Sequence, residues 1–208
     1  KEYLSWKELS IIYVNISDLP GANIKVSSIR EYSMGSYYAH TLGYTSLFRD
    51  SNDAYSYSSK IPSLPVGKTG IEKVYDSFLR GIPGTEQVEV NAQGKKVRRL
   101  NIIKSVPGNN VQLTINSEMQ DFTHRVIGSN IGAALVLDAK NGNIISSASS
   151  PSYDPNIFSK TLNKISWKNI MNASDAPLLN RPIKGLYPPG STFKPFVALA
   201  ALKHGLIS

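Results

Sequence analysis

The sequence predicts an α+β fold, and segments in its second half carry that prediction. Two apolar strands, 131–138 and 143–149, flank Lys140-Asn-Gly, which is a strong signal for a tight hairpin. A helix is predicted over 117–127, and a second one over 193–207 has apolar residues around most of its circumference. Adjacent strands followed by a buried helix are typical of an α+β catalytic domain.

The chain before about Pro107 is rich in turn residues and short alternating segments. Thr69, followed three residues later by Glu72, is typical of a capping box, so a helix is predicted over 70–79. This interpretation accounts for the triplet Lys68-Thr-Gly without giving it a catalytic role. The segment 50–59, in which Ser, Tyr, Asn and Asp dominate, is predicted to be a long surface loop.

The helix over 117–127 has its own start signal. Ser117 with Gln120 is typical of a second capping box. The residues that give this helix one apolar face are Met119, Phe122, Val126 and Ile127.

The formal net charge of +8 raises the question of a nucleic-acid partner. The densest basic stretch, 95–99, follows a predicted hairpin with Gly94 in its turn, so these charges are expected on a solvated ribbon. No stacking aromatics interleave with them, as single-strand binding would require. No nucleic-acid partner is therefore expected, whereas attraction of a basic surface to anionic lipid or wall polymer stays open.

Composition sets further limits. A chain of 208 residues with 41% hydrophobic content allows one large or two small domains. No apolar run approaches the roughly 20 residues needed to cross a bilayer. The three histidines are dispersed and cysteine is absent, so neither a metal site nor thiol chemistry is expected.

Ser191 and Lys194 form the candidate catalytic pair. Residues three apart on a helix are surface neighbours, so the Lys194 amine can take the proton of the Ser191 hydroxyl during attack on a carbonyl. This requires burial or a neighbouring cation that lowers the lysine pKa, and the apolar helix over 193–207 is expected to supply the burial. Pro188-Pro-Gly turns the chain before the helix, and no other serine has a lysine three residues later.

The segment around Ser191 and Lys194, and the chain on its N-terminal side, resemble the class B penicillin-binding proteins, and among them the elongation type. The resemblance runs nearly end to end and is most specific over 180–195. Other matching stretches are Arg30-Glu-Tyr-Ser-Met-Gly, Ala39-His-Thr-Leu-Gly-Tyr, Gly70-Ile-Glu-Lys-Val-Tyr and Ser150-Pro-Ser-Tyr-Asp-Pro-Asn. It implies a mostly β pedestal, or dimerisation-type, domain over 1–115, followed over 116–208 by the first strands and active-site helix of an incomplete, β-lactamase-like serine transpeptidase domain.

The resemblance also implies a function. The parent protein would be a peptidoglycan D,D-transpeptidase of cell-wall elongation, acylated at Ser191 by stem peptides and by β-lactams, with Lys194 as base and no cofactor. It would be anchored in the bacterial inner membrane and face the periplasm, with the anchor absent from this chain. Expected partners of the pedestal are a membrane glycan polymerase and elongation scaffold proteins, with Glu72, Tyr75 and Arg80 as surface candidates.

The chain departs from the family in one respect. A Ser-x-Asn and a late Lys-Thr-Gly are expected well after the nucleophile, and this sequence ends at Ser208. The chain is therefore expected to be a fragment that is inactive alone. A serine β-lactamase or a β-lactam sensor is the alternative enzyme or receptor, disfavoured by the pedestal-like residues upstream. A non-catalytic scaffold or interaction module is the alternative from another class.

Overall fold

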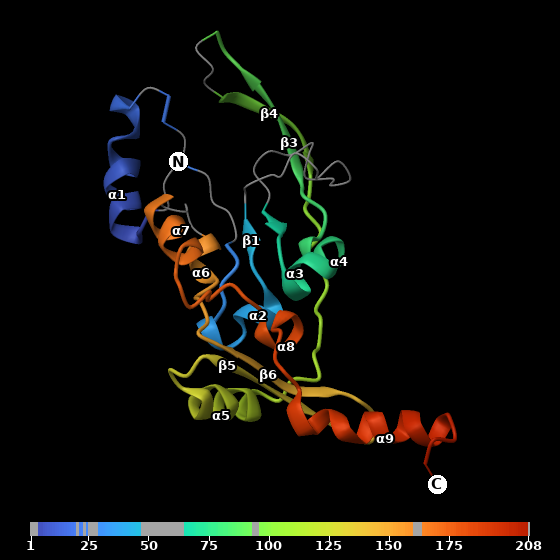
Figure 1. The fold of residues 1–208 in the computed structure, drawn as a ribbon. Helices are drawn as coiled ribbons and strands as arrows, with labels where there is room; N and C mark the ends of the chain where they lie inside the picture. The colour runs from blue at the N-terminus through green and yellow to red at the C-terminus, as the bar shows by residue number, and fades with distance from the viewer. Residues whose placement is uncertain are drawn as a thin grey trace.

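A computed structural model of the chain describes residues 4–19, 21–22, 24, 29–46, 65–92, 96–159 and 164–207. Its helices and strands are α1 (Trp6–Val14), α2 (Ala39–Leu42), β1 (Thr45–Ser46), β2 (Val66–Gly67), α3 (Gly70–Val74), α4 (Asp76–Arg80), β3 (Thr85–Val90), β4 (Lys96–Ile103), α5 (Ser117–Ile127), β5 (Gly132–Leu137), β6 (Ile144–Ser150), α6 (Asn156–Ser159), α7 (Lys164–Met171), α8 (Arg181–Lys184) and α9 (Lys194–Lys203). Short 3-10 turns are η1 (Ile16–Asp18), η2 (Gly35–Tyr37) and η4 (Gly190–Phe193). This mixture of helices and strands confirms the α+β prediction (Figure 1).

The hairpin predicted around Lys140-Asn-Gly is confirmed. β5 and β6 pair antiparallel, and the turn closes through a hydrogen bond from the Asp138 N–H to the Asn143 carbonyl at 2.9 Å. The Asp138 carboxylate also accepts the Lys140 N–H at 2.9 Å, and Gly142 adopts a φ of +76° that favours glycine. Local turn chemistry therefore sets this part of the fold. Figure 1 shows α5 lying along one face of the hairpin.

The described part of the basic stretch, residues 96–99, lies on a second hairpin, as expected. β3 and β4 pair antiparallel and project away from the rest of the chain in Figure 1. Arg98 and Arg99 are exposed and each forms a 2.5 Å ion pair across the strands, with Glu89 and Glu86 respectively. The predicted turn at Gly94 and the predicted loop over 50–59 lie outside the described residues.

Both predicted capping boxes are wrong. Thr69 is the N-cap of α3, but its side chain makes no capping hydrogen bond. The Glu72 carboxylate does not turn back to the N-cap either, because it is buried against residues far away in the sequence. The predicted helix over 70–79 also divides into α3 and α4. Asp76 is the first residue of α4. Its carboxylate accepts the Gly67 N–H at 2.9 Å, which ties α4 to β2.

The second capping box fails for a similar reason. Asn116, not Ser117, caps α5, since its Oδ1 accepts the Met119 N–H at 2.9 Å. Gln120 is fully buried and its amide accepts the Ser147 N–H at 2.8 Å and donates to the Ser147 carbonyl at 2.8 Å. The inward face of α5 is thus polar. The predicted apolar face lies outward, with Phe122 57% exposed.

The core brings the two halves of the chain together. Its buried members are Ala39 from the first half and Tyr153 and Phe158 from the second. Tyr44 stacks on Phe158 with ring centroids 3.9 Å apart. The half-buried residues around this cluster are Tyr44, Ile157, Trp167 and Leu178. Because both halves contribute side chains, this core fixes the first half against the second.

A row of hydrogen bonds, here called the 32–40 seam, lies beside this core. Five side chains of the second half each donate to a backbone carbonyl of the segment 32–40. The bonds are Asn156 Nδ2 to Tyr32 at 2.9 Å, Ser152 Oγ to Ser36 at 2.7 Å, Gln120 Nε2 to Tyr37 at 2.7 Å, Tyr153 OH to Ala39 at 3.3 Å and Asn180 Nδ2 to His40 at 3.2 Å. In these five bonds every donor is a side chain and every acceptor is main chain, while the Tyr32 N–H donates in return to Asn156 Oδ1 at 2.9 Å.

Candidate active site

The candidate nucleophile lies where a turn becomes a helix. Pro189 precedes η4 and Gly190 has a φ of +54°, so the chain reverses direction just before Ser191. Lys194 begins α9, and its N–H donates to the Ser191 carbonyl. Pro195 lies in the first turn of α9, where its missing N–H costs little. The local geometry therefore places Ser191 and Lys194 on one continuous helical turn.

The expected burial of this pair is wrong for the described residues. Ser191 and Lys194 are exposed, and so are the apolar side chains of α9, with Phe196 64% and Leu199 64% exposed. Among the residues that the structure describes, neither catalytic candidate has a side-chain hydrogen bond or ion pair. Figure 1 shows α9 extending away from the rest of the chain. Desolvation of Lys194 must therefore come from something other than the described residues.

The tract leading to Ser191 is attached to the sheet through α8. Arg181, at the start of α8, is only 5% exposed, and its N–H donates to Ser149 Oγ on β6 at 3.2 Å. Its guanidinium donates to the Ala176 carbonyl at 3.1 Å and to the Asp175 carbonyl. Sequence reasoning did not single out Arg181. The available signal was a cation within the most family-specific tract, at the beginning of a short helix.

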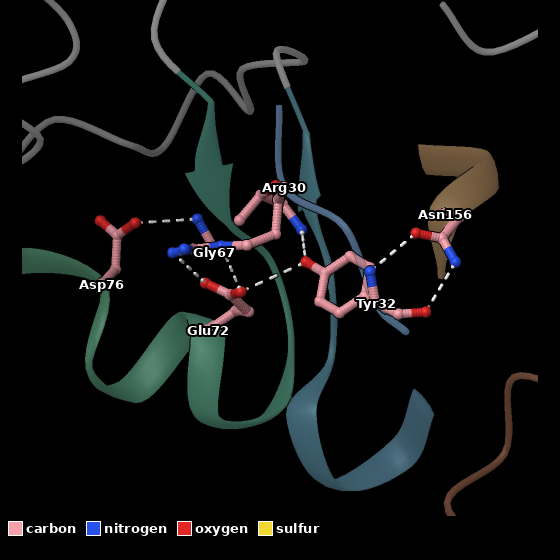
Figure 2. Close-up of polar contacts among 7 residues, drawn as sticks. Arg30, Tyr32, Gly67, Glu72, Asp76 and Asn156 are labelled. Carbon is pink, nitrogen blue, oxygen red and sulfur yellow. Dashed lines mark hydrogen bonds and ion pairs between the residues drawn. The ribbon is translucent and has the colours of Figure 1, made fainter. Parts of the chain in front are cut away.

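An ion pair with a buried carboxylate lies in the first half of the chain. Figure 2 shows Arg30 facing the Glu72 carboxylate, with Arg30 Nε and Nη2 at 2.7 Å and 3.2 Å from its oxygens. The Tyr32 hydroxyl donates to Glu72 at 3.3 Å and accepts the Thr45 N–H at 3.0 Å. Burial, and secondarily the Glu72 charge, raise the pKa of Tyr32, so this hydroxyl stays a donor. Asn156 bonds both the N–H and the carbonyl of Tyr32 at 2.9 Å.

These contacts correct the expected partner surface. Glu72 is 6% exposed and its carboxylate is fully engaged, so its assignment as a surface residue is wrong. The Arg80 side chain is 12% exposed and forms an ion pair with Asp76 one turn earlier. Only Tyr75, at 44% exposure, remains accessible among the three candidates.

His40 is a buried ionisable group at the junction of the two halves. Burial, and then the positive charges of Arg181 and His124, lower the pKa of His40 to about 4. Its ring packs edge-on against Tyr153 with centroids 5.2 Å apart. The folded chain therefore keeps this imidazole neutral under conditions in which an unfolded chain would protonate it.

We expect a loss of stability in mild acid that depends on His40. Below an unfolded pKa of about 6.5 the unfolded chain binds a proton that folded His40 does not, so the free energy of unfolding falls as the pH drops from about 6.5 toward 4. The contribution should be about 1–2 kcal/mol at about pH 5, since the ring is not fully buried. Urea unfolding across this range measures it. His40→Asn should flatten the pH dependence, and an unchanged slope in that variant would contradict the assignment.

The described ranges contain neither a cluster of metal ligands nor a membrane-spanning helix. No group of three His, Asp or Glu side chains in them could hold a metal ion. None of the helices in these ranges is both long enough and apolar enough to cross a membrane.

Two family models match the chain. One, described as the penicillin-binding protein dimerisation domain, matches residues 1–113, and the penicillin-binding protein transpeptidase domain matches residues 132–208. Peptidoglycan D,D-transpeptidase MrdA of Escherichia coli K12 is 32% identical over all of this chain and 34% of its own length. The enzyme of the same name from Salmonella typhimurium is 34% identical, again over all of this chain and 34% of its own length. The chain thus spans about a third of the curated relatives that it matches.

Solved structures agree with the family models. Pseudomonas aeruginosa PBP2 in complex with WCK 5153 superposes with a TM-score of 0.72 at 30% identity, covering 89% of this chain and 38% of that one. Helicobacter pylori PBP2, in its complex with MreC, superposes with a TM-score of 0.79 at 29% identity, covering 99% of this chain and 38% of that one. The resemblance seen in the sequence is confirmed, and the chain belongs to the penicillin-binding proteins.

Proposed function

We propose that the whole protein is a peptidoglycan D,D-transpeptidase of cell-wall elongation that works through an acyl-enzyme at Ser191. The observation that carries this proposal is the Ser191–Lys194 spacing on one helical turn, within a segment that matches the transpeptidase-domain model. The activity named for the curated relatives supports it. We place the domain boundary near residues 115 and 116, in the gap between the two family matches.

The reaction follows from the two side chains. Ser191 Oγ attacks the carbonyl carbon of the penultimate D-Ala as its proton passes to Lys194, and the C–N bond to the terminal D-Ala breaks. The leaving amine takes the proton. An amine of a neighbouring stem peptide then attacks the ester, which restores the Ser191 hydroxyl. The Ser191 N–H, in the first turn where helical N–H groups lack internal partners, supplies one oxyanion donor.

The exposure of the pair limits what this chain does alone. Lys194 acts as a base only where its charged form is disfavoured, and the described residues leave it exposed. We infer that the remainder of the relatives' length covers Ser191 and Lys194 and supplies the second oxyanion donor. The 208-residue chain by itself should therefore form no long-lived penicillin adduct.

The same proposal includes partners and location. Stem peptides and β-lactams are the expected ligands of Ser191, at the periplasmic face of the inner membrane. The first half of the chain would contact a membrane glycan polymerase and an elongation scaffold protein. The complex of Helicobacter pylori PBP2 with MreC supports the scaffold contact.

Mass spectrometry of the whole protein after exposure to penicillin tests the function. We expect one added penicillin mass per chain. Trypsin does not cleave the Lys194–Pro195 bond, so the adduct should lie on the peptide that runs from Gly185 to Lys203, where Ser191 is the only serine. An adduct elsewhere, or none, would contradict the proposal. Rapid hydrolysis of the adduct would instead indicate a β-lactamase.

A further inference from the structure

Ser149 and Arg181 form a small polar anchor beneath the tract that leads to the nucleophile. The Ser149 side chain is fully buried on β6, where its hydroxyl donates to the Leu179 carbonyl at 2.9 Å and accepts the Arg181 N–H at 3.2 Å. One hydroxyl thus ties both ends of a three-residue stretch to the sheet. The Arg181 guanidinium is equally enclosed, and its described partners are peptide carbonyls.

The guanidinium also secures the turn that comes before it. The carbonyls of Asp175 and Ala176 both accept from Arg181, and Ala176 has a φ of +45°, which is unfavourable for a residue with a side chain. A planar, forked cation can bridge two neighbouring carbonyls, which a single ammonium does less well. Arg181 therefore fixes the turn at 175–176 to the first turn of α8.

This anchor is the last attachment of the chain to the sheet before Ser191. Arg181 is buried, whereas all described residues from Leu186 to Ile207 are exposed apart from Ala201, which is half-buried. Local contacts constrain the link between anchor and nucleophile. The Gly185 N–H donates to the Arg181 carbonyl at 2.9 Å, the Tyr187 ring lies against Gly185, and two prolines follow.

We propose that Ser149 and Arg181 are positioning residues for Ser191, an inference that rests on the proposed transpeptidase function. They act through the backbone of α8 and do not touch the substrate. Attack on a carbonyl is sensitive to shifts of about 1 Å, which can cost about 100-fold in rate. Loosening the anchor should therefore slow acylation without weakening the initial, non-covalent binding of the ligand.

The test measures acylation of the whole protein by a fluorescent penicillin, resolved into a non-covalent dissociation constant and a first-order acylation rate. In Ser149→Ala and Arg181→Met we expect the rate to fall about 10- to 100-fold while the dissociation constant changes by less than about threefold. Arg181→Lys, which keeps the charge, should lie between Arg181→Met and the wild type. Arg125→Met is the matched control, because Arg125 is 64% exposed and pairs with Asp121 on α5.

The adduct formed at saturation reports the folded fraction of each variant, so the rate is compared per labelled site. A merely structural role would lower that fraction and leave the rate unchanged, and this result would overturn the proposal. If Arg181→Met does not fold, Ser149→Ala decides, since it removes a single oxygen. Failure of the wild type to label would overturn the proposed function itself, which separates the two inferences.

Discussion

Replacing Ser191 by alanine is expected to abolish covalent labelling of the whole protein by penicillin. The variant lacks the hydroxyl that lies three residues before Lys194 on this helical turn, so the acylation rate should fall by roughly 10⁴-fold or more. The exposed side chain makes no hydrogen bond with any described residue, so stability should stay within about 0.5 kcal/mol of the wild type. Intact-mass spectrometry and thermal unfolding measure the two effects.

The neighbouring hydroxyl is a suitable control for this substitution. Thr192 lies in the same turn, and its Oγ1 donates to the Pro189 carbonyl, so it is engaged in the local structure. Thr192→Ala should still label to one penicillin per chain at saturation. Complete labelling of Ser191→Ala, or loss of labelling only in Thr192→Ala, would show that the nucleophile has been assigned wrongly.

Replacing Glu72 by alanine is expected to produce a large loss of stability. It leaves the Arg30 guanidinium and the Tyr32 hydroxyl without their common acceptor. Removing one member of a buried pair costs about 3–5 kcal/mol, and the 39% exposure of the Arg30 side chain allows it to regain some water. We therefore expect a loss of about 2–4 kcal/mol, measured by urea unfolding.

The β3–β4 hairpin offers a matched pair for comparison. Glu89 also bonds an arginine, Arg98, but these side chains are 45% and 70% exposed. Glu89→Ala should cost less than about 1 kcal/mol, because exposed ion pairs are weak. Equal effects at Glu72 and Glu89 would mean that burial does not govern the contribution of these pairs.

The parts of the fold that could be predicted are those set by neighbouring residues. The Asn141-Gly142 turn forms because its conformation is chemically local, and Ser191 and Lys194 share a turn because their spacing alone requires it. The two predicted capping boxes do not form, because Glu72 and Gln120 bind residues that are distant in the sequence. Glu72 finds Arg30, 42 positions away, and a pattern of four letters contains no information about that contact.

The candidate site was predictable in its chemistry but not in its surroundings. The sequence shows a hydroxyl and an amine at helical spacing, whereas burial depends on what packs against α9, and the described residues leave that helix exposed. Arg181 and Ser149 escaped prediction for a related reason. Both side chains bind backbone carbonyls, and every residue type has the same carbonyl. The identities of the acceptor residues therefore give no sign of these bonds.

The 32–40 seam bears on how this family can change over evolutionary time. Any amino acid presents the same carbonyl, so Ser36 can be exchanged without removing the acceptor that Ser152 uses, whereas the Tyr37 ring also stacks on His124 with centroids 4.9 Å apart. The donor residues cannot be exchanged in the same way, because each bond requires a particular polar side chain. A scan of all substitutions should therefore be asymmetric, with position 36 permissive and positions 120 and 152 restrictive. Position 36 can then change without a matching change at position 152.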